Sequence, residues 1–491
     1  MSSASLRLKR TAQALLLGLP LCAGLSYPVA NWRGQQVLDT YKAEMMARGF
    51  PATREEYFNP PAVPAEDDMM QHPAMLKNLK DRKVSLKSRV EKKLDLRFAA
   101  RKKTKFSLSK GIITDLAQWR PGEGKDSRDV ADEILTLLHE ERKEALTLTE
   151  ALKRPTAVFP IEWKTATNGR KFPTVLYAEA VIETLPMFTL FLQLDLAAGD
   201  HHHIPQWIHA QLDFQKHSAK YSKSSYLAIF NKLTTLRISE SIWQAGMQGA
   251  LTEQDYQQLD LRLQDMDAGQ VLHQSLHSIF MESAPRVENF RKKTAIREGW
   301  GSSPKEWWQR LRGLTVELRP PGLTAIRQVD AMREIRDYAM DAKGRPTHRF
   351  TLTDLRHFEE KEKRASIYKF NNDIYGTCQV AEQLDVDALH YQYMAIMIRS
   401  SLDAEAGVAL TRAGIALERH RLKSGTYPAD LAELGTDLPS DPYTGQSLHY
   451  RKNPDGTALI WACGIDAKDD GGKANDIPWY ANPQIQPASN R

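Results

Sequence analysis

The spacing of apolar residues changes several times along the chain, and each pattern predicts a different kind of element. Residues 12–29 form an apolar run that is nearly long enough to cross a bilayer as a helix. Apolar and basic residues alternate between Val84 and Phe98, which predicts a β-strand with one basic face. Helical spacing dominates residues 129–283 and 380–424. Together the patterns predict a mainly α fold with small β parts.

These patterns divide the chain of 491 residues, which is too long for one ordinary core, into several segments. We expect a signal anchor or transmembrane segment at 1–30, a spacer at 31–80, a basic β segment at 81–120, a helical domain at 125–300, a mixed and mostly helical region at 301–400, an α+β domain at 401–482 and a tail at 483–491. The spacer is predicted from the proline-rich residues 59–64, which break regular structure. In the helical domain, Gly199 and Asp200 interrupt a long helical run and predict a helical hairpin. Residues 252–255 resemble a capping box that begins another helix.

The N-terminus carries the features of a targeting segment. Arg7, Lys9 and Arg10 precede the apolar run, and basic residues in this position keep the N-terminus in the cytoplasm while the rest is exported. We therefore predict a single-pass inner-membrane protein, anchored by an uncleaved N-terminal helix, with its bulk on the periplasmic side. A cleaved signal peptide is the alternative, because Gly24 and Ser26 are the small residues that a signal peptidase needs.

Charge is unevenly distributed. The net charge of +6 is mild, but basic residues concentrate between Lys77 and Lys110. The basic face at residues 83–97 predicts contact with an anionic surface such as lipid headgroups, although most such faces are simply solvated. No nucleic-acid partner is expected, because an exported chain seldom meets one and no aromatic residues interleave with these charges.

The residue types that usually perform catalysis or bind metals form no recognisable motif. Cys22, Cys378 and Cys463 lack metal-type spacing, and a single Cys378–Cys463 disulfide is the pairing left open. Adjacent histidines at 201–203 cannot all face one ion. His273 and His277 are four apart but lack the intervening Glu of a zinc protease. We therefore predict no catalytic residue and no cofactor-binding residue.

The strongest pattern lies near the C-terminus. A helix that ends at Gly425 precedes a Tyr-Pro corner and an Asp-Pro turn. Two short strands are predicted at 448–451 and 458–462, separated by a turn at 453–456, and an acidic, glycine-rich loop follows them. The residues of these motifs are Tyr427, Pro428, Asp441, Pro442, Gly445, Gly464, Asp466, Asp469, Asp470, Gly471, Gly472 and Asp476.

This order of elements resembles the globular domain of the major pseudopilin of type II secretion systems, over residues 402–479. The resemblance implies a pseudopilin-like α+β domain whose last loop binds calcium. Its Gly-x-Asp and Asp-Ile positions match Asp466 and Asp476, and Asp469 and Asp470 between them are further candidate ligands. The chain departs from that family in its leader, which lacks the expected Glu, so assembly into a pseudopilus is not expected. The whole chain also resembles uncharacterised membrane-anchored bacterial envelope proteins.

Two functions are compatible with these patterns. The first is a membrane-anchored envelope protein of non-catalytic type, an interaction or scaffold protein related to secretion or surface assembly. The alternative is an exported hydrolase with an unrecognised active site in the helical region, because active sites can assemble from residues far apart in sequence.

Overall fold

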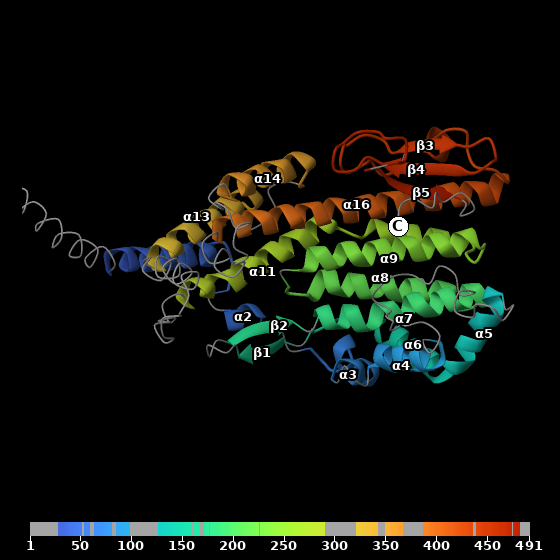
Figure 1. The fold of residues 1–491 in the computed structure, drawn as a ribbon, viewed down its shortest axis with the longest axis horizontal. Helices are drawn as coiled ribbons and strands as arrows, with labels where there is room; N and C mark the ends of the chain where they lie inside the picture. Colours follow the sequence, from blue (N-terminus) through green and yellow to red (C-terminus); the bar gives the residue numbers. More distant parts are fainter. Residues whose placement is uncertain are drawn as a thin grey trace, which may run out of the picture. The chain divides into compact units, whose positions relative to one another are not determined.

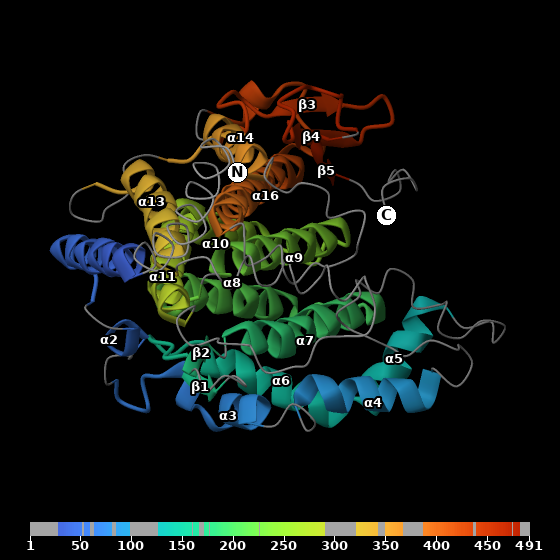
Figure 2. The same ribbon diagram turned by 60° about the vertical axis from the view of Figure 1, so that its left-hand side comes forward.

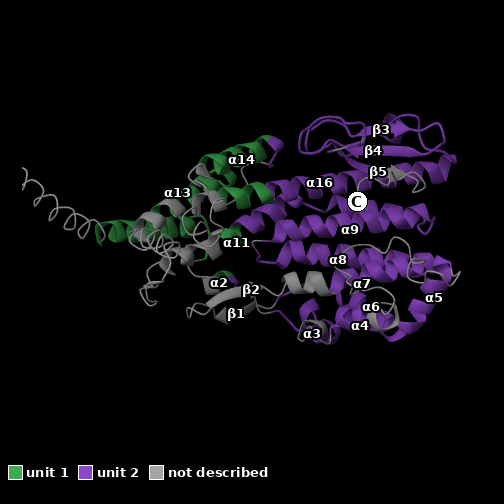
Figure 3. Ribbon diagram, in the orientation of Figure 1, with its two compact units in different colours: residues 1–57, 277–349, 353–396 green, residues 58–276, 350–352, 397–491 purple. Residues whose placement is uncertain are grey.

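The computed structural model describes residues 28–51, 54–58, 63–80, 85–98, 126–159, 161–165, 171–175, 177–224, 226–289, 321–341, 349–366, 386–435, 438–473 and 475–481. The chain divides into two compact units (Figure 3). Unit 1 comprises Met1–Tyr57, His277–Arg349 and Thr353–Ile396, and unit 2 comprises Phe58–Leu276, Phe350–Leu352 and Met397–Arg491. The described elements are mainly helical, as the sequence predicted.

Unit 2 is a layered assembly of helices with a small sheet. Its helices are α3 (Pro73–Lys80), α4 (Leu86–Phe98), α5 (Ser127–Leu137), α6 (His139–Ala151), α7 (Tyr177–Ala198), α8 (Ile204–Tyr221), α9 (Leu227–Met247) and α10 (Glu253–Gln264), with the short helices η1 (Met69–Gln71) and η6 (Leu431–Leu434). Residues 268–276 of α11 (Ala268–Asn289) and residues 397–424 of α16 (Val386–Ser424) also belong to it. A hairpin of β1 (Ile161–Thr165) and β2 (Lys171–Val175) was not predicted.

The main helices of unit 2 lie side by side in the order α7, α8, α9 and α16 (Figure 1). Helices α3, α4 and α6 lie on the other side of α7 (Figure 2). Gly199, with a positive φ of 74°, forms the turn between α7 and α8, which confirms the predicted helical pair. The Thr252 and Asp255 side chains form the predicted capping box at the start of α10.

Close packing joins α16 to α9. A Cβ added at Gly407 would lie 3.2 Å from Thr235 Cγ2, so the absence of a side chain lets the two helices approach. The Thr411 hydroxyl lies 2.7 Å from the Ser239 hydroxyl at the same contact. Asp403 on α16 pairs with Lys232 on α9 and accepts a hydrogen bond from Tyr443. The C-terminal part of the chain is therefore fastened to the helical layers by several kinds of contact.

The C-terminal sheet follows α16 and lies on the side of that helix away from α9 (Figures 1 and 2). It is antiparallel, in the order β3 (His449–Lys452), β4 (Ala458–Ala462) and β5 (Ile477–Ala481). Gly425 ends α16 with φ +79°, and Gly456 with φ +84° closes the turn between β3 and β4. Both features, and the first two strands, confirm the prediction, whereas β5 was missed.

Unit 1 contains a helix at residues 28–47, residues 54–57 of α2 (Arg54–Phe58), α13 (Pro321–Ala339) and residues 353–366 of α14 (Leu352–Ser366). Residues 277–289 of α11 and 386–396 of α16 complete it. Glu44 accepts hydrogen bonds from Arg333 at 2.7 Å and Arg336 at 2.7 Å, which ties the first helix to α13. Arg336 also lies over the ring of the buried Tyr41. Within the predicted mixed region, residues 301–320, 342–348 and 367–385 lie outside the described residues.

The predicted basic strand is wrong, because residues 86–98 form helix α4. Leu86, Val90 and Leu94 are buried, and they recur every four residues, which places them on one face of a helix. Residues 99–120 of the predicted β segment lie outside the described residues. The spacer prediction needs a similar correction, because Met69, Met70 and Met75 are fully buried in unit 2 rather than part of an extended link.

The prediction of a membrane anchor is also corrected. Within the described ranges, no helix combines the length and the apolar character that a bilayer span requires. This finding contradicts the expected transmembrane helix, the signal anchor and the single-pass inner-membrane location. The apolar α7 instead packs against α5 and α8, and it carries Glu183 and Asp195. Residues 12–27, on which the prediction rested, lie outside the described residues.

Candidate functional site

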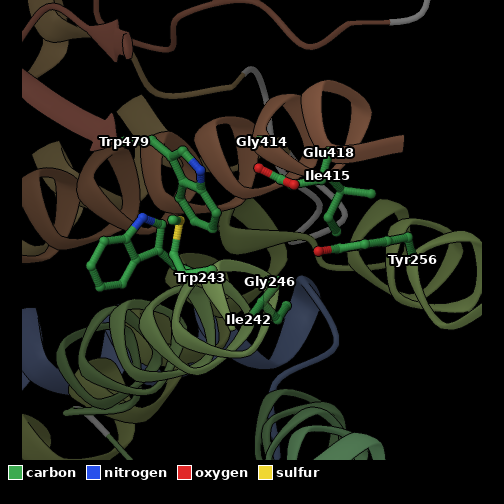
Figure 4. A pocket seen from close by; sticks show the side chains of 9 residues that line it. Ile242, Trp243, Gly246, Tyr256, Gly414, Ile415, Glu418 and Trp479 are labelled. Atoms are coloured by element: carbon green, nitrogen blue, oxygen red, sulfur yellow. The ribbon is translucent and has the colours of Figure 1, made fainter. Parts of the chain in front are cut away.

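A small aromatic pocket lies within unit 2 and is lined by residues of α9, α10 and α16 and by Trp479 of β5 (Figure 4). About 220 Å³ of empty space, part of it open to solvent, lies among its lining residues. The residues that line it are Ile242, Trp243, Gly246, Met247, Tyr256, Gly414, Ile415, Glu418 and Trp479. Figure 4 shows the two indole rings on one side and the Tyr256 hydroxyl pointing in from the other. We refer to this site as the aromatic pocket.

Two glycines in helices allow the aromatic rings to reach their positions. A Cβ at Gly414 would lie 2.5 Å from the Trp479 ring, and a Cβ at Gly246 would lie 2.7 Å from the Tyr256 hydroxyl. Real side chains do not approach so closely, so any other residue would force these rings to move. The glycines therefore shape the pocket although their backbones are ordinary helix.

Glu418 is the charged residue among those that line the pocket, and it is 6% exposed. Tyr427 donates a hydrogen bond to Oε1 at 2.6 Å, and Arg421 donates one to Oε2 at 2.8 Å. Burial and the Glu418 carboxylate raise the pKa of both Tyr256 and Tyr427 above the usual tyrosine value. Both phenols are therefore neutral at physiological pH.

The arrangement suits binding better than catalysis. Acid–base chemistry generally needs two groups with separated proton affinities, or a nucleophile beside a base. The lining supplies one carboxylate, already bonded to a guanidinium and a phenol, and otherwise apolar or aromatic side chains. Such a surface is chemically equipped to hold a group in place rather than to transform it.

The four predicted calcium ligands lie in the acidic loop between β4 and β5, but their carboxylate oxygens have different hydrogen-bond partners. Asp476 Oδ2 accepts backbone hydrogen bonds from Asp470 at 2.8 Å and Gly472 at 2.9 Å. Asp469 Oδ1 accepts one from the Trp461 indole at 2.9 Å. The Asp466 carboxylate accepts one from the Asn475 side chain at 3.0 Å, which lowers its pKa.

The loop brings Asp470 and Asp476 together but does not gather all four carboxylates. Within the part of the chain that the structure describes, no three His, Cys, Asp or Glu residues are grouped closely enough to hold a metal ion. Asp476 Oδ1 is nevertheless buried without a hydrogen-bond partner, and burial raises the pKa of this carboxyl. Oxygen donors of this kind suit calcium chemically.

A cysteine and a histidine that no sequence motif links lie close together, His449 at the start of β3 and Cys463 directly after β4. Cys463 Sγ is 3.5 Å from His449 Nε2, and His449 Nδ1 is 3.3 Å from Asp469 Oδ2. This resembles the order of groups in a thiol hydrolase. However, Cys463 is 2% exposed, and burial with the nearby carboxylates raises its pKa to about 12. A thiol so protected and so weakly acidic is a poor nucleophile.

Cys463 is not in a disulfide, and Cys378, its predicted partner, lies outside the described residues. The histidines at 201–203 form a turn before α8, where His203 Nδ1 is 3.1 Å from the Gln206 side chain. Neither group contributes to a metal cluster in the described ranges.

Part of the predicted anionic contact at residues 83–97 is already paired with acidic residues of α6. Arg89 lies 2.7 Å from Glu144, and Lys93 lies 2.7 Å from the buried Glu141. Lys77 adds a second contact to Glu144 at 2.8 Å. These charges connect α3 and α4 to α6, so Arg89 and Lys93 of the basic segment serve packing.

Comparisons with known proteins add nothing to this geometry. A scan against models of protein families, a search of curated proteins and a search of solved structures each returned no match. The sequence predicted the acidic loop but missed the aromatic pocket, whose residues are far apart along the chain. The one local signal was the presence of glycines inside the helical patterns around residues 246 and 414.

Proposed function

We propose that this chain is a non-catalytic interaction protein whose helical layers form a scaffold and whose aromatic pocket binds a protein partner. The observation that carries the proposal is the pocket lining, in which three aromatic side chains and one buried carboxylate line the same site. Tryptophan and tyrosine are enriched at the centres of protein interfaces, where they contribute most of the binding energy.

The proposed relation to type II secretion rests on the sequence resemblance of residues 402–479 to the major pseudopilin. The helix, the Tyr-Pro corner, the Asp-Pro turn and the acidic loop all have the order that the resemblance implies. In support, Asp441 organises its turn by accepting backbone hydrogen bonds from Tyr443 at 2.8 Å and Cys463 at 2.9 Å. A role in secretion or surface assembly is therefore our proposal for the biological setting.

Affinity purification with paired variants tests the function. In the full-length bait, Trp243→Leu removes one wall of the pocket. The control Trp32→Leu removes a tryptophan of unit 1 that is 61% exposed. We expect the first substitution to lose partners that the wild-type and Trp32→Leu baits both retain. Circular dichroism confirms that each bait is folded. Identical sets of partners for all three baits contradict the proposal.

The hydrolase alternative placed its active site in the helical region, whereas the contact that offers a defined test, Cys463 with His449, lies at the C-terminal sheet. Full-length protein is assayed against p-nitrophenyl esters beside a Cys463→Ala variant. We expect no release of nitrophenol above the background of that variant, because the thiol is buried. Turnover that disappears with Cys463→Ala would replace the interaction proposal with a catalytic one.

Calcium binding by the acidic loop is retained as a proposal on the strength of the unpartnered oxygen of Asp476. Asp466 and Asp469 would have to exchange their present hydrogen bonds for the ion. We expect calcium added to EGTA-treated protein to raise the melting temperature of wild type but not of Asp476→Asn. The proposal fails if calcium leaves the melting temperature of wild type unchanged.

A further inference from the structure

We infer that the outward face of α9 pairs with the same face of a second copy of this chain. This face, the α9 stripe, comprises Tyr226, which directly precedes the helix, and Leu233, Leu236, Arg237 and Glu240. Neighbouring members are three, four or seven residues apart, so they lie along one side of the helix. Tyr226 is 48% exposed, Leu233 47% and Leu236 39%. The pairing is independent of the aromatic pocket and goes beyond the proposed function.

The opposite side of α9 is packed inside unit 2. The residues buried there are Asn231, Thr234, Thr235, Ile238, Ser241, Ile242 and Ala245. Among them, Asn231 and Thr235 accept hydrogen bonds from the Gln215 side chain of α8 at 2.8 Å and 2.6 Å. These contacts fix the orientation of the helix and leave the stripe as its outward side. Exposed apolar side chains that gather along one face are typical of interaction sites, whereas scattered ones are not.

Arg237 is partly buried in the stripe without an acceptor of its own. Within the residues that the structure describes, its guanidinium forms no hydrogen bond and no ion pair. Burial lowers the pKa of Arg237, and the nearby charge of Glu240 offsets the effect only in part. A guanidinium has five donors, and removing it from water is costly unless acceptors meet it. A partner that supplies a carboxylate removes this cost.

The order of charges on the stripe makes it complementary to itself. In a twofold symmetric contact, residue i of one copy meets residue j of the other, and residue j meets residue i. An antiparallel pair of α9 helices centred between positions 238 and 239 places Arg237 of each copy opposite Glu240 of the other. Leu233 and Leu236 then lie beside two guanidinium–carboxylate pairs. A parallel pair would instead bring the two Arg237 side chains together.

Sedimentation velocity of the full-length chain, from about 1 to about 100 µM, tests the inference. One helix contributes a small contact, so we expect a reversible monomer–dimer equilibrium in this range rather than a permanent dimer. Leu233→Asp is expected to weaken the association by about tenfold or more, because it buries a charge in the contact. Leu261→Asp, at a 62% exposed position of α10, is the matched control and should associate as wild type does.

A charge exchange identifies the contact itself. Arg237→Glu and Glu240→Arg are each expected to weaken the association by about tenfold or more, because like charges then face each other across the axis. The double variant restores opposite charges and should recover most of the wild-type affinity, with circular dichroism as the check on folding.

Three results overturn the inference. The first is wild type that stays monomeric at about 100 µM. The second is a dimer that Leu233→Asp and Leu261→Asp leave equally intact, and the third is a folded double variant that does not recover association. None of these results bears on the proposed function, which is tested by the partners that the Trp243→Leu bait loses.

Discussion

At the scale of single residues, the shape of the aromatic pocket depends on the absence of a side chain at two helical positions. Gly414 and Gly246 lie against Trp479 and Tyr256, respectively, closer than any Cβ permits. Glycine inside a helix normally costs about 0.5–1 kcal/mol relative to alanine. Here alanine is expected to be the more destabilising residue, because it displaces an aromatic ring.

Substitution of Gly414 by alanine tests this reversal. We expect a loss of about 1–3 kcal/mol in the free energy of unfolding, since the Trp479 ring has to move. Gly269→Ala is the matched control, because its Cβ would meet the side chain of Asp267 at 3.1 Å and no backbone or ring. The control is expected to be neutral or slightly stabilising in urea titrations. Equal effects of the two substitutions would show that ring displacement is not the cause.

Buried phenols predict sensitivity to high pH. Burial and the charge of Glu418 raise the pKa of Tyr427 in the folded state above its unfolded value of about 10. A raised pKa means that the stabilisation is fully present below about pH 10 and is lost as the pH rises toward the folded value. We expect the melting temperature to fall above pH 10, together with the tyrosinate absorbance change. Tyr427→Phe should have a shallower alkaline decline, and an unchanged slope contradicts the assignment.

At the scale of elements, α4 shows why a correct pattern led to a wrong element. Leu86, Val90 and Leu94 recur every four residues. A spacing of four equals two repeats of a strand and about one turn of a helix, so it places residues on one face in either element. The pattern alone could not distinguish the two. The intervening Lys, Arg and Glu residues are good helix formers, and their propensity favours a helix over a strand here. In contrast, α10 and the end of α16 were predicted correctly, because a capping box and Gly425 have local physical causes.

The ion pairs between α4 and α6 make the stability of the protein sensitive to low pH. Burial acts to raise the pKa of Glu144, but hydrogen bonds from Lys77 and Arg89 outweigh it and hold the pKa below its usual value. A lowered pKa contributes stability above the unfolded value of about 4.3, and that stability is lost as the pH falls through the folded value. We expect Glu144→Gln to lower the melting temperature at pH 7 but to have little effect near pH 3. An equal effect at both pH values would contradict the ion-pair account.

At the scale of the whole molecule, the C-terminal part of the chain depends on the helical layers of unit 2. The sequence suggested a separate domain at 401–482, yet Tyr443 bonds to Asp403, which also pairs with Lys232 on α9. Trp479 lines a pocket together with Trp243 and Tyr256 of α9 and α10. No local pattern could have predicted this, because the contacts with α9 and α10 join residues more than 150 positions apart. Strands β3 and β4 were predictable from the turn between them, whereas β5 and the packing of the sheet were not.

The dependence of the C-terminal part on the layers can be measured with a fragment. A chain of residues 397–491 lacks Lys232, Trp243 and Tyr256, so the apolar surface of Ile415 and Trp479 is exposed to water. We expect its melting temperature, followed by circular dichroism, to be well below that of the full-length chain. A fragment that melts at the same temperature would show that residues 397–491 are stable without the helical layers.

The central claim is that the aromatic pocket is where this protein holds a partner, and a photo-crosslinker at the pocket measures this most directly. Benzoylphenylalanine replaces Met247 in the full-length chain, and the same group at Leu261, a 62% exposed residue of α10, provides the control. After irradiation of intact cells, we predict a discrete adduct from position 247 that is absent from position 261 and from a Met247 crosslinker chain that also carries Trp243→Leu. The same adducts from both positions, or none from position 247, would contradict the claim.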